Sequence, residues 1–461
     1  MTLDIGSRRE LFVDHYLIDR LEGVSLRLHE PHREGVAVRF DYPWEGPLSG
    51  YFTVLDDGER YRMYYRGWPE LKDEYAGSVT CYAESRDGVT WQKPQLGLYE
   101  VLGTRANNVI LDEAILSVNF CPFVDTRPGV PSAERFKALA GTGNAGGSMG
   151  FVSEDGIHWR RLQQAHVIPK TIKGWDTQNV AFWSDHEQCY VAYVRSWKMI
   201  GDEDYRWIAR TTSDDFIHWS DVVDMDYGDT PPEQLYTPAT QPYFRAPHIY
   251  VALPKRFLPD TPALPADEAR ALVCHESQCI SSSDAVFMTS RGGNRYDRTF
   301  MEAFIGPGPT RRDWVARDNM PAVGVVAARD DPRSMFIYRG SYSGQSSAHL
   351  TRYSLRLDGF VSVNAPYRGG EMITKPFRFE GDRLTLNFAT SAAGGLRVEI
   401  QDEKGKALPG YNLEDCPQFI GDRIDHAVGW TGGAEVSSLA GKPVRLRFVM
   451  RDADLYSIRF V

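Results

Sequence analysis

The 461-residue sequence lacks several features that would place it in a large functional class. No apolar run approaches 18 residues, and the first ten residues carry no apolar core of a signal peptide. There is no run of basic residues, and the net charge is −10. We therefore expect a soluble protein that binds neither nucleic acid nor a membrane. The chain as given predicts a cytoplasmic location, or a periplasmic or secreted one if a leader has been removed.

Motifs for several common chemistries are also missing. None of the six cysteines forms a CxxC pair, which argues against a structural zinc site. The sequence contains no G-x-S-x-G string and no Walker string, so a serine-hydrolase elbow and a phosphate loop have no support. No cofactor and no metal ion are therefore expected from motifs.

Aromatic residues are abundant instead, with 23 Tyr, 22 Phe and 11 Trp, and Gly and Pro are spread along the chain. This composition favours short strands joined by turns over long helices. Few stretches have a sustained helical period. The best candidate for a short helix is residues 265–271. The sequence therefore predicts an all-β fold.

A turn motif recurs along the chain and indicates an internal repeat. Copies lie at residues 85–91, 153–159 and 213–219, each with Ser first, Asp third and Trp last, and a degenerate copy lies at residues 290–296. The steps between the tryptophans are 68 and 60 residues. A repeat of about 60 residues with hairpin turns fits the four-stranded blade of a β-propeller. The Asp and Trp of these turns are predicted to be structural.

Each repeat also has a front half made of two apolar strands around a turn. These halves predict a five-bladed β-propeller over residues 1–370. We expect the strand at residues 11–14 to join the last blade, because closing the ring removes exposed edges. The predicted strand pairs are 51–55 with 61–66, 120–124 with 136–140, 180–183 with 190–195, 240–244 with 249–253, and 322–327 with 335–338.

The pattern of apolar and polar residues changes after Gly369 and Gly370. Residues 384–388, 396–400 and 444–450 alternate apolar and polar side chains with a period of two. This alternation is typical of an antiparallel β-sandwich with one buried face. We therefore expect a small accessory β-sandwich over residues 371–461, with no catalytic role.

These features resemble a known group of enzymes. A five-bladed propeller with Ser-x-Asp-Gly-x-x-Trp turns and a following β-sandwich is similar to glycoside hydrolase families 32, 43 and 117. Four strings narrow the resemblance to bacterial glycosyl-hydrolase-like proteins of uncharacterised activity. The sequence lacks the Trp-x-Asn-Asp-Pro, Arg-Asp-Pro and Glu-Cys-Pro strings, so residue roles from fructosidases do not transfer. The four strings cover residues 10–14, 175–182, 235–237 and 451–457.

Candidate catalytic residues are carboxylates, because the common route of glycoside hydrolysis needs two of them, one protonated. Asp176 is the first candidate, as base or nucleophile, since it lies in a polar cluster just before an apolar strand. Glu302 is the candidate acid, because flanking apolar residues would raise its pKa. Asp284 is a third, modulating carboxylate. Each has a structural alternative, as a turn cap, an exposed strand residue or a loop cap.

Candidate substrate-binding residues lie where inner strands begin or second strands end, since those positions line one mouth of a propeller. Three arginines at equivalent repeat positions, Arg66, Arg195 and Arg339, suggest a site for a carboxylate or sulfate. Their alternative role is to pair with carboxylates of neighbouring blades. The remaining candidates are Glu45, Trp68, Asn119, Gln178, Asn179, Trp197, Tyr236, Arg317, Asn319 and His349.

The sequence therefore predicts a glycoside hydrolase acting on an anionic or otherwise modified oligosaccharide, uronate-containing or sulfated. Two alternatives stay open. One is a polysaccharide lyase that uses an arginine-neutralised uronate and a Tyr or His base. The other is a propeller that binds glycans without catalysis. The sugar, the linkage, the stereochemical outcome, a calcium ion in the funnel and the oligomeric state stay undetermined by the sequence.

Overall fold

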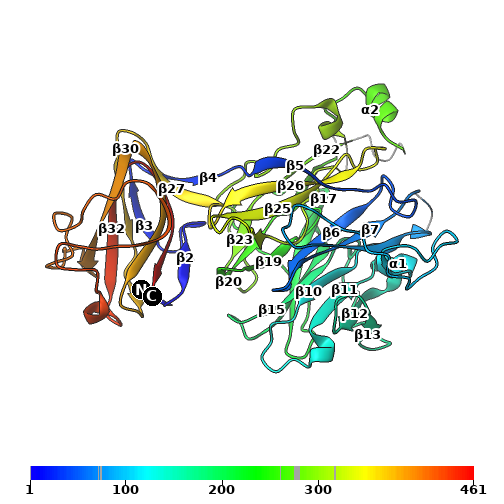
Figure 1. Cartoon of the computed structure of the whole chain (residues 1–461), viewed down its shortest axis with the longest axis horizontal. Helices are drawn as coiled ribbons and strands as arrows, with labels where there is room; N and C mark the ends of the chain where they lie inside the picture. The colour runs from blue at the N-terminus through cyan, green and yellow to red at the C-terminus, as the bar shows by residue number, and fades with distance from the viewer. Residues whose placement is uncertain (1, 71, 73–74, 260, 275–280, 316–317) are drawn as a thin grey trace. The chain divides into compact units, whose positions relative to one another are not determined.

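A computed structural model describes residues 2–70, 72, 75–259, 261–274, 281–315 and 318–461. The chain is almost entirely β-structure (Figure 1). Two short α-helices occur among the described residues, α1 (Ala114–Ser117) and α2 (Ala266–Leu272). The second confirms the helix predicted at residues 265–271. No helix in these ranges is long and apolar enough to span a membrane.

The chain forms two compact units. One comprises residues 1–30 and 355–461, and the other comprises residues 31–354. This division differs from the predicted boundary at residue 370 in two ways. The first thirty residues group with the C-terminal strands, and so do residues 355–370.

The unit of residues 31–354 contains antiparallel sheets that follow one another along the chain, most of them simple meanders (Figure 1). A first sheet has four strands: β6 (Gly50–Asp56), β7 (Tyr61–Gly67), β8 (Val79–Ser85) and β9 (Val109–Leu111). A second has β10 (Cys121–Val124), β11 (Phe136–Ala140), β12 (Gly147–Ser153), β13 (Arg160–Arg161) and β14 (Ile168–Pro169). A third has β15 (Val180–Ser184), β16 (Cys189–Ile200), β17 (Glu203–Ser213) and β18 (Val223–Asp224).

The remaining sheets of this unit are less regular. One contains β19 (Thr240–Tyr243), β20 (Ala246–Ala252) and β23 (Met288–Ser290), beside the pair β21 (Lys255–Leu258) and β22 (Ser282–Ala285). The last contains β24 (Val326–Ala327), β25 (Ser334–Ser341), β26 (His349–Arg356) and β5 (His32–Arg39). Short 3₁₀ turns are η2 (Ser132–Glu134), η3 (Gly143–Ala145) and η5 (Arg311–Trp314).

The strand that completes this last sheet is not the predicted one. β5 pairs with β26, and it comes from residues 32–39. Residues 11–14, which we expected there, lie in the other unit. Leu11 ends β2 and pairs with Ser457, and Phe12 is buried in that unit's core. The expectation was wrong because an apolar run shows that a strand is buried but not which sheet it joins.

The repeated turns confirm their predicted structural role. In the first copy, Asp87 accepts hydrogen bonds from the backbone N–H groups of Val89 and Thr90, both at 2.8 Å, while Ser85 Oγ receives the N–H of Gly88. The other two copies repeat this pattern around Asp155 and Asp215. The carboxylate therefore closes a tight turn, as a backbone cap does.

Tyrosine hydroxyls from neighbouring sheets reach these turns and others like them. Tyr338 of β25 donates to the carbonyl of Gly88 at 2.6 Å, and Tyr64 of β7 donates to the carbonyl of Gly156 at 2.9 Å. Both glycines have a positive φ, and a Cβ at either would approach the incoming phenol oxygen to 3.0 Å or less. Glycine is therefore required by the backbone conformation and by the close approach.

Two further tyrosines connect successive sheets in the same way. Tyr190 of β16 donates to Asp125 at 2.7 Å, and Tyr250 of β20 donates to Glu187 at 2.7 Å. All four donors lie on the second strand of their sheets. A buried hydrogen bond of this kind contributes about 1 kcal/mol.

The unit of residues 1–30 and 355–461 is built on two long strands, β30 (Leu384–Asp402) and β32 (Val444–Phe460), which pair over most of their length. Its other strands join them in one ten-stranded hydrogen-bonded network. The 3₁₀ turn η6 covers Ser437–Leu439. The other strands are β1 (Leu3–Gly6), β2 (Arg9–Leu11), β3 (Ile18–Glu22), β4 (Ser25–Leu28), β27 (Val361–Ala365), β28 (Gly370–Thr374), β29 (Phe377–Phe379) and β31 (Asp422–Ala427).

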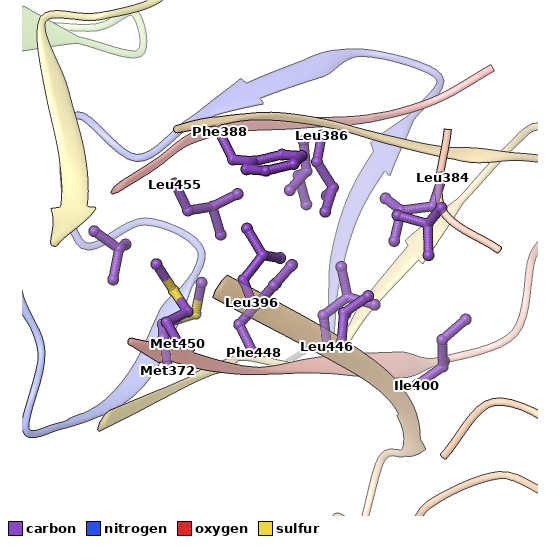
Figure 2. Close-up of a cluster of buried hydrophobic side chains, with 14 of the residues drawn as sticks. Met372, Leu384, Leu386, Phe388, Leu396, Ile400, Leu446, Phe448, Met450 and Leu455 are labelled. Carbon is purple, nitrogen blue, oxygen red and sulfur yellow. The ribbon is translucent and has the colours of Figure 1, made fainter. Parts of the chain in front are cut away.

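The core of this unit follows the predicted alternation. Figure 2 shows side chains from β30 and β32, among them Leu396, Ile400, Leu446 and Phe448, packed together on one side of their strands. All four are at most 1% exposed. Residues of opposite parity on these strands therefore point to the other face.

The first prediction concerns the turn at Asp87. Burial opposes its charge, but the N–H groups of Thr90 and Val89 and the Ser85 hydroxyl outweigh this and lower the pKa of Asp87 to about 2. We expect Asp87→Ala to reduce the free energy of unfolding by about 1 kcal/mol at pH 7, measured by urea titration.

The same measurement has a defined pH dependence. An unfolded aspartate titrates near a pKa of about 3.9, so the contribution of Asp87 is complete above about pH 4 and is lost as the pH falls through about 2. The difference between wild type and variant should vanish over that range. Exposed Asp229, replaced by Ala, is the control and should change little. A difference that persisted at pH 2 would contradict the assignment.

Candidate active site

A cavity of about 130 Å³ lies in the unit of residues 31–354, at the ends of several of its strands. It is lined by residues from the start of β6, the end of β7, the segments that precede β15 and β19, the end of β25 and the start of β26. Among them are Tyr51, Arg66, Trp68, Tyr75, Asp176, Tyr236, Ser343 and His349.

The backbone around this cavity is strained. Tyr51 (φ 53°) and Tyr75 (φ 62°) line it, and Trp175 (φ 82°), Asn319 (φ 61°) and Tyr342 (φ 60°) each adjoin a lining residue. Non-glycine residues seldom adopt a positive φ, at a cost of about 1–3 kcal/mol each, and such residues cluster at functional sites. Several strained loops therefore converge on one cavity.

Asp176 is exposed at this cavity, and the buried residue before it fixes its position. The preceding Trp175 is fully buried, and its indole N–H donates to Ser148 Oγ at 2.9 Å. Burial, together with the neighbouring Asp176 carboxylate, raises the pKa of Tyr75. Tyr75 is therefore a protonated donor, and Asp176 is an accessible carboxylate.

Arg66 is the cation of the cavity. Its guanidinium donates to the carbonyl of Leu48 at 2.8 and 3.2 Å, and lies 4.9 Å from the ring centre of Tyr51 and 5.1 Å from that of Trp68. Among the described residues it has no carboxylate within ion-pair distance, and burial lowers the pKa of Arg66. A half-buried guanidinium with no ion-pair partner favours an anionic ligand.

The other two arginines of the expected set do not line the cavity. Arg195 donates to the carbonyl of Tyr236 and stacks on its ring at 4.4 Å. Arg339 donates to the carbonyls of Gly306 at 2.7 Å and Pro307 at 3.2 Å. Both are buried and brace loops. The three-arginine ring predicted from the repeat is therefore reduced to one guanidinium at the cavity.

His349 supplies a neutral imidazole at the cavity wall. The ring lies edge-on to Tyr342 with centres 5.0 Å apart, and Nδ1 lies 2.8 Å from the carbonyl of Ser347, which assigns the proton to Nδ1. Nε2 finds no hydrogen-bond partner among the described residues. Burial lowers the pKa of His349, so Nε2 carries a lone pair at neutral pH.

Asp318 is a second carboxyl close to the cavity. It is fully buried, and the N–H of Ser343, a lining residue, lies 3.4 Å from its Oδ1. Burial, opposed by the charge of Arg339, raises the pKa of Asp318 to about 6. The sequence did not reveal Asp318 as a candidate, because its burial depends on contacts with Arg339 of β25 and with Ser343 just after that strand.

The other two catalytic candidates lie apart from this arrangement. Asp284 is held by both nitrogens of the Arg256 fork, at 2.8 and 2.5 Å, and Arg256 also pairs with Glu233 at 2.7 Å. Glu302 is exposed, so its apolar neighbours in sequence do not bury it. Neither lines the cavity. Asp284 is an ion-pair partner, and the expected burial of Glu302 was wrong.

Glu45 is also structural. Its carboxylate is fully buried and receives the Tyr65 hydroxyl at 2.5 Å, the Lys93 ammonium at 2.8 Å and the N–H of Tyr42 at 3.0 Å. It is a saturated acceptor beneath the loop that carries Trp44, and it is absent from the lining. Its place in the sequence, between Trp and Gly, did not reveal these partners.

The predicted amide residues anchor loops. Asn119 bridges Gly141 and Thr177, and Gln178 donates to the carbonyl of Tyr51 at 2.9 Å. Asn179 accepts the N–H of Arg195 at 3.1 Å, and Asn319 donates to Ser283 at 2.7 Å. These bonds hold the strained segments around the cavity and place the four amides behind its wall.

Among the remaining candidates, Trp68 and Tyr236 line the cavity, whereas Trp197 lies outside it beside the Arg206 guanidinium at 4.6 Å. Arg317 falls outside the described residues. Tyr51 and Tyr75 were missed by sequence reasoning, since neither belongs to a motif. Within the described ranges, no group of three or more His, Cys, Asp or Glu side chains is placed to hold a metal ion.

Comparisons with known proteins found two uncharacterised relatives and a number of similar solved structures. No family model matches the sequence. Two curated proteins of Mycobacterium tuberculosis, "Uncharacterized protein Rv1502" of strain H37Rv and "Uncharacterized protein MT1551" of strain CDC 1551, are each 28% identical over 149 residues. The match covers 31% of this chain and 40% of each relative, well under two thirds of their length.

Solved structures similar to the chain include glycoside hydrolases and other glycan-active proteins. An N-acetylgalactosamine deacetylase from F. plautii, in complex with blood group B trisaccharide, is 12% identical, with a TM-score of 0.47 over 72% of this chain and 96% of its own. A fructofuranosidase from Schwanniomyces occidentalis, complexed with fructosylnystose, is 10% identical, with a TM-score of 0.42 over 93% and 97%.

Proposed function

We propose that this protein is a glycoside hydrolase that cleaves an oligosaccharide carrying a carboxylate or sulfate group. The observation that carries the proposal is the cavity itself. It is lined by the exposed carboxylate of Asp176, the phenol of Tyr75 and the guanidinium of Arg66, which has no ion-pair partner among the described residues. Arg66 supplies recognition of the anionic group, and Asp176 supplies a carboxylate at the reacting bond. Aromatic faces at Trp68 and Tyr236 offer surfaces on which sugar rings stack.

The architecture we propose for this activity is a five-bladed β-propeller over residues 31–354 and a β-sandwich formed by the other unit. Support for the propeller comes from the succession of antiparallel sheets, the repeated Asp turns and the tyrosine contacts from one sheet to the next. Support for the sandwich comes from the single apolar core beneath β30 and β32.

In the mechanism we propose, Arg66 binds the anionic group and orients the sugar against Asp176. Asp176 acts as base or nucleophile, and the Tyr75 hydroxyl holds its orientation. Asp318 is the proposed source of the proton for the leaving group, because its carboxyl remains protonated up to about pH 6. Asp318 does not line the cavity, so we propose that a water molecule beside Ser343 passes the proton from Asp318 Oδ2 to the leaving-group oxygen.

A lyase is the second candidate, and one observation favours it. Asp176 is the single carboxylate among the described residues that line the cavity, and the neutral Nε2 of His349 has the lone pair that a base needs. In that case Arg66 neutralises a uronate carboxylate and His349 removes the neighbouring carbon-bound proton. The product then contains a carbon–carbon double bond, which absorbs ultraviolet light.

We expect Asp176→Asn to lower turnover of a cleaved substrate by at least 100-fold. The substrate is found by screening uronate-containing and sulfated oligosaccharides with product chromatography. The melting temperature should stay within about 2 °C, since Asp176 is exposed. Saturated products support the hydrolase, and unsaturated products identify the lyase. Unchanged turnover in the variant would remove Asp176 from the site.

Arg66→Gln should raise KM for the anionic substrate by about 10- to 100-fold, because the guanidinium supplies charge-assisted hydrogen bonds to the anion. The same oligosaccharide with its carboxyl groups reduced to alcohols should be a poor substrate for wild type and equally poor for the variant. Arg86→Gln, a change at an exposed arginine, is the matched control. Equal cleavage of anionic and reduced substrates by wild type would contradict an anionic substrate.

The pH profile tests Asp318. As a general acid it must be protonated, so kcat should fall as the pH rises above about 6. Asp318→Asn keeps an acceptor for the Ser343 N–H and removes the proton. We expect kcat of this variant to be about 100-fold lower than that of wild type. The fall of kcat above about pH 6 should also be absent. A variant that kept the wild-type profile would exclude Asp318 as the acid.

A further inference from the structure

An open groove of about 620 Å³ lies on the unit of residues 1–30 and 355–461. We propose that it is a second carbohydrate site, which binds an anionic polysaccharide chain and belongs to a different unit from the cavity. The groove runs over β28, β30 and β32. The side chains used below are Arg397, Arg447, Arg451, Glu371 and Gln418, all of which line it.

Strand geometry places these side chains on one face. Figure 2 shows Leu396, Phe448 and Met450 directed into the core, so their neighbours of opposite parity point away from it. Arg397 lies opposite Val449, and Arg451 lies opposite Gly395 two positions further along β32. Arg397 and Arg451 are therefore diagonal neighbours on the outer face of the pair.

The groove is locally cationic in an acidic protein. Its lining contains four arginines and two glutamates, whereas the whole chain has a net charge of −10. Arg447 is neutralised, since it pairs with Glu371 at 2.6 Å and Glu399 at 3.4 Å. Arg397 and Arg451 have no carboxylate within ion-pair distance among the described residues, and Arg451 donates to the carbonyl of Ala393 at 2.6 Å. Arg368 has none either, so three guanidinium groups remain for an external anion.

An aromatic ring beside these guanidinium groups points to a sugar. Tyr367 is 67% exposed, and the Arg451 guanidinium lies 5.5 Å from its ring centre. A large exposed aromatic at the edge of a polar groove offers a face on which a pyranose ring stacks. The ring and the arginines together match a chain in which sugar rings alternate with carboxylate or sulfate groups.

The floor of the groove carries an amide side chain, for which a glycine makes room. Gly395 has no side chain, and a Cβ there would lie 2.1 Å from Gln418 Nε2. The exposed Gln418 amide therefore rests on the strand, where it offers a donor and an acceptor for hydroxyl groups. Nucleic acid fits less well, because the chain is acidic overall and has no basic run.

This site takes the same class of ligand as the proposed function but stands apart from its chemistry. A groove that holds a polyanion raises the local concentration of substrate when both sites engage one chain. Binding at the groove and turnover of short oligosaccharides are therefore separable measurements.

The test uses the full chain carrying Asp176→Asn, titrated with polygalacturonate fragments and with dextran sulfate by isothermal calorimetry. Adding Arg397→Gln and Arg451→Gln should weaken binding at least 10-fold, and adding Tyr367→Ala alone should weaken it about threefold. The matched control adds Arg383→Gln and Arg423→Gln, two exposed arginines of the same unit outside the groove. Thermal melting confirms that each variant is folded.

The outcomes are distinct. Loss of binding in the groove variant, with turnover of short oligosaccharides retained when Asp176 is restored, supports the second site. Unchanged binding in the groove variant, or binding abolished only by Arg66→Gln, overturns it and leaves the proposed function intact. Tighter binding of single-stranded DNA than of either polysaccharide also overturns it. Absence of binding to every polyanion overturns it too, whether or not wild type cleaves short substrates.

Discussion

Hydrogen bonds from buried tyrosines to the turns of neighbouring sheets are the interaction on which the unit of residues 31–354 depends. Tyr64 and Tyr338 donate to glycine carbonyls, and Tyr190 and Tyr250 donate to carboxylates. Apolar clusters pack these sheets together, and each tyrosine adds a directional contact to a turn of the next sheet. Burial raises the pKa of all four phenols, so that each remains a donor.

These hydrogen bonds between sheets help the unit to tolerate the strained backbone around the cavity. Positive φ values at Tyr51, Tyr75 and Trp175, together with the desolvated guanidinium of Arg66, all cost free energy. Anchored strands on either side prevent these loops from relaxing. The same anchoring leaves Asp176 exposed while Trp175 behind it is fully buried. Strain, an unpaired cation and an accessible carboxylate therefore coincide in one place.

The strands themselves were largely predictable. Period-two alternation identified β30 and β32. Three strand pairs predicted from the repeats match the pairs β6–β7, β10–β11 and β15–β16. Strand partnership over long separations was less predictable. Residues 11–14 were assigned to the wrong sheet, because an apolar strand of this length suits any buried edge.

Asp176 illustrates what the sequence determined and what it did not. Its polar cluster before an apolar strand indicated a loop residue at a strand end, because that pattern is local. Its partnership with Tyr75 and Arg66 was decided by the tertiary structure, because both come from a sheet more than 100 residues earlier. Equally local patterns selected Asp284 and Glu45, yet folding placed Arg256 and Lys93 against them. Local periodicity thus determined the β-strands and turns, whereas long-range contacts decided which charges are paired and which remain to bind a ligand.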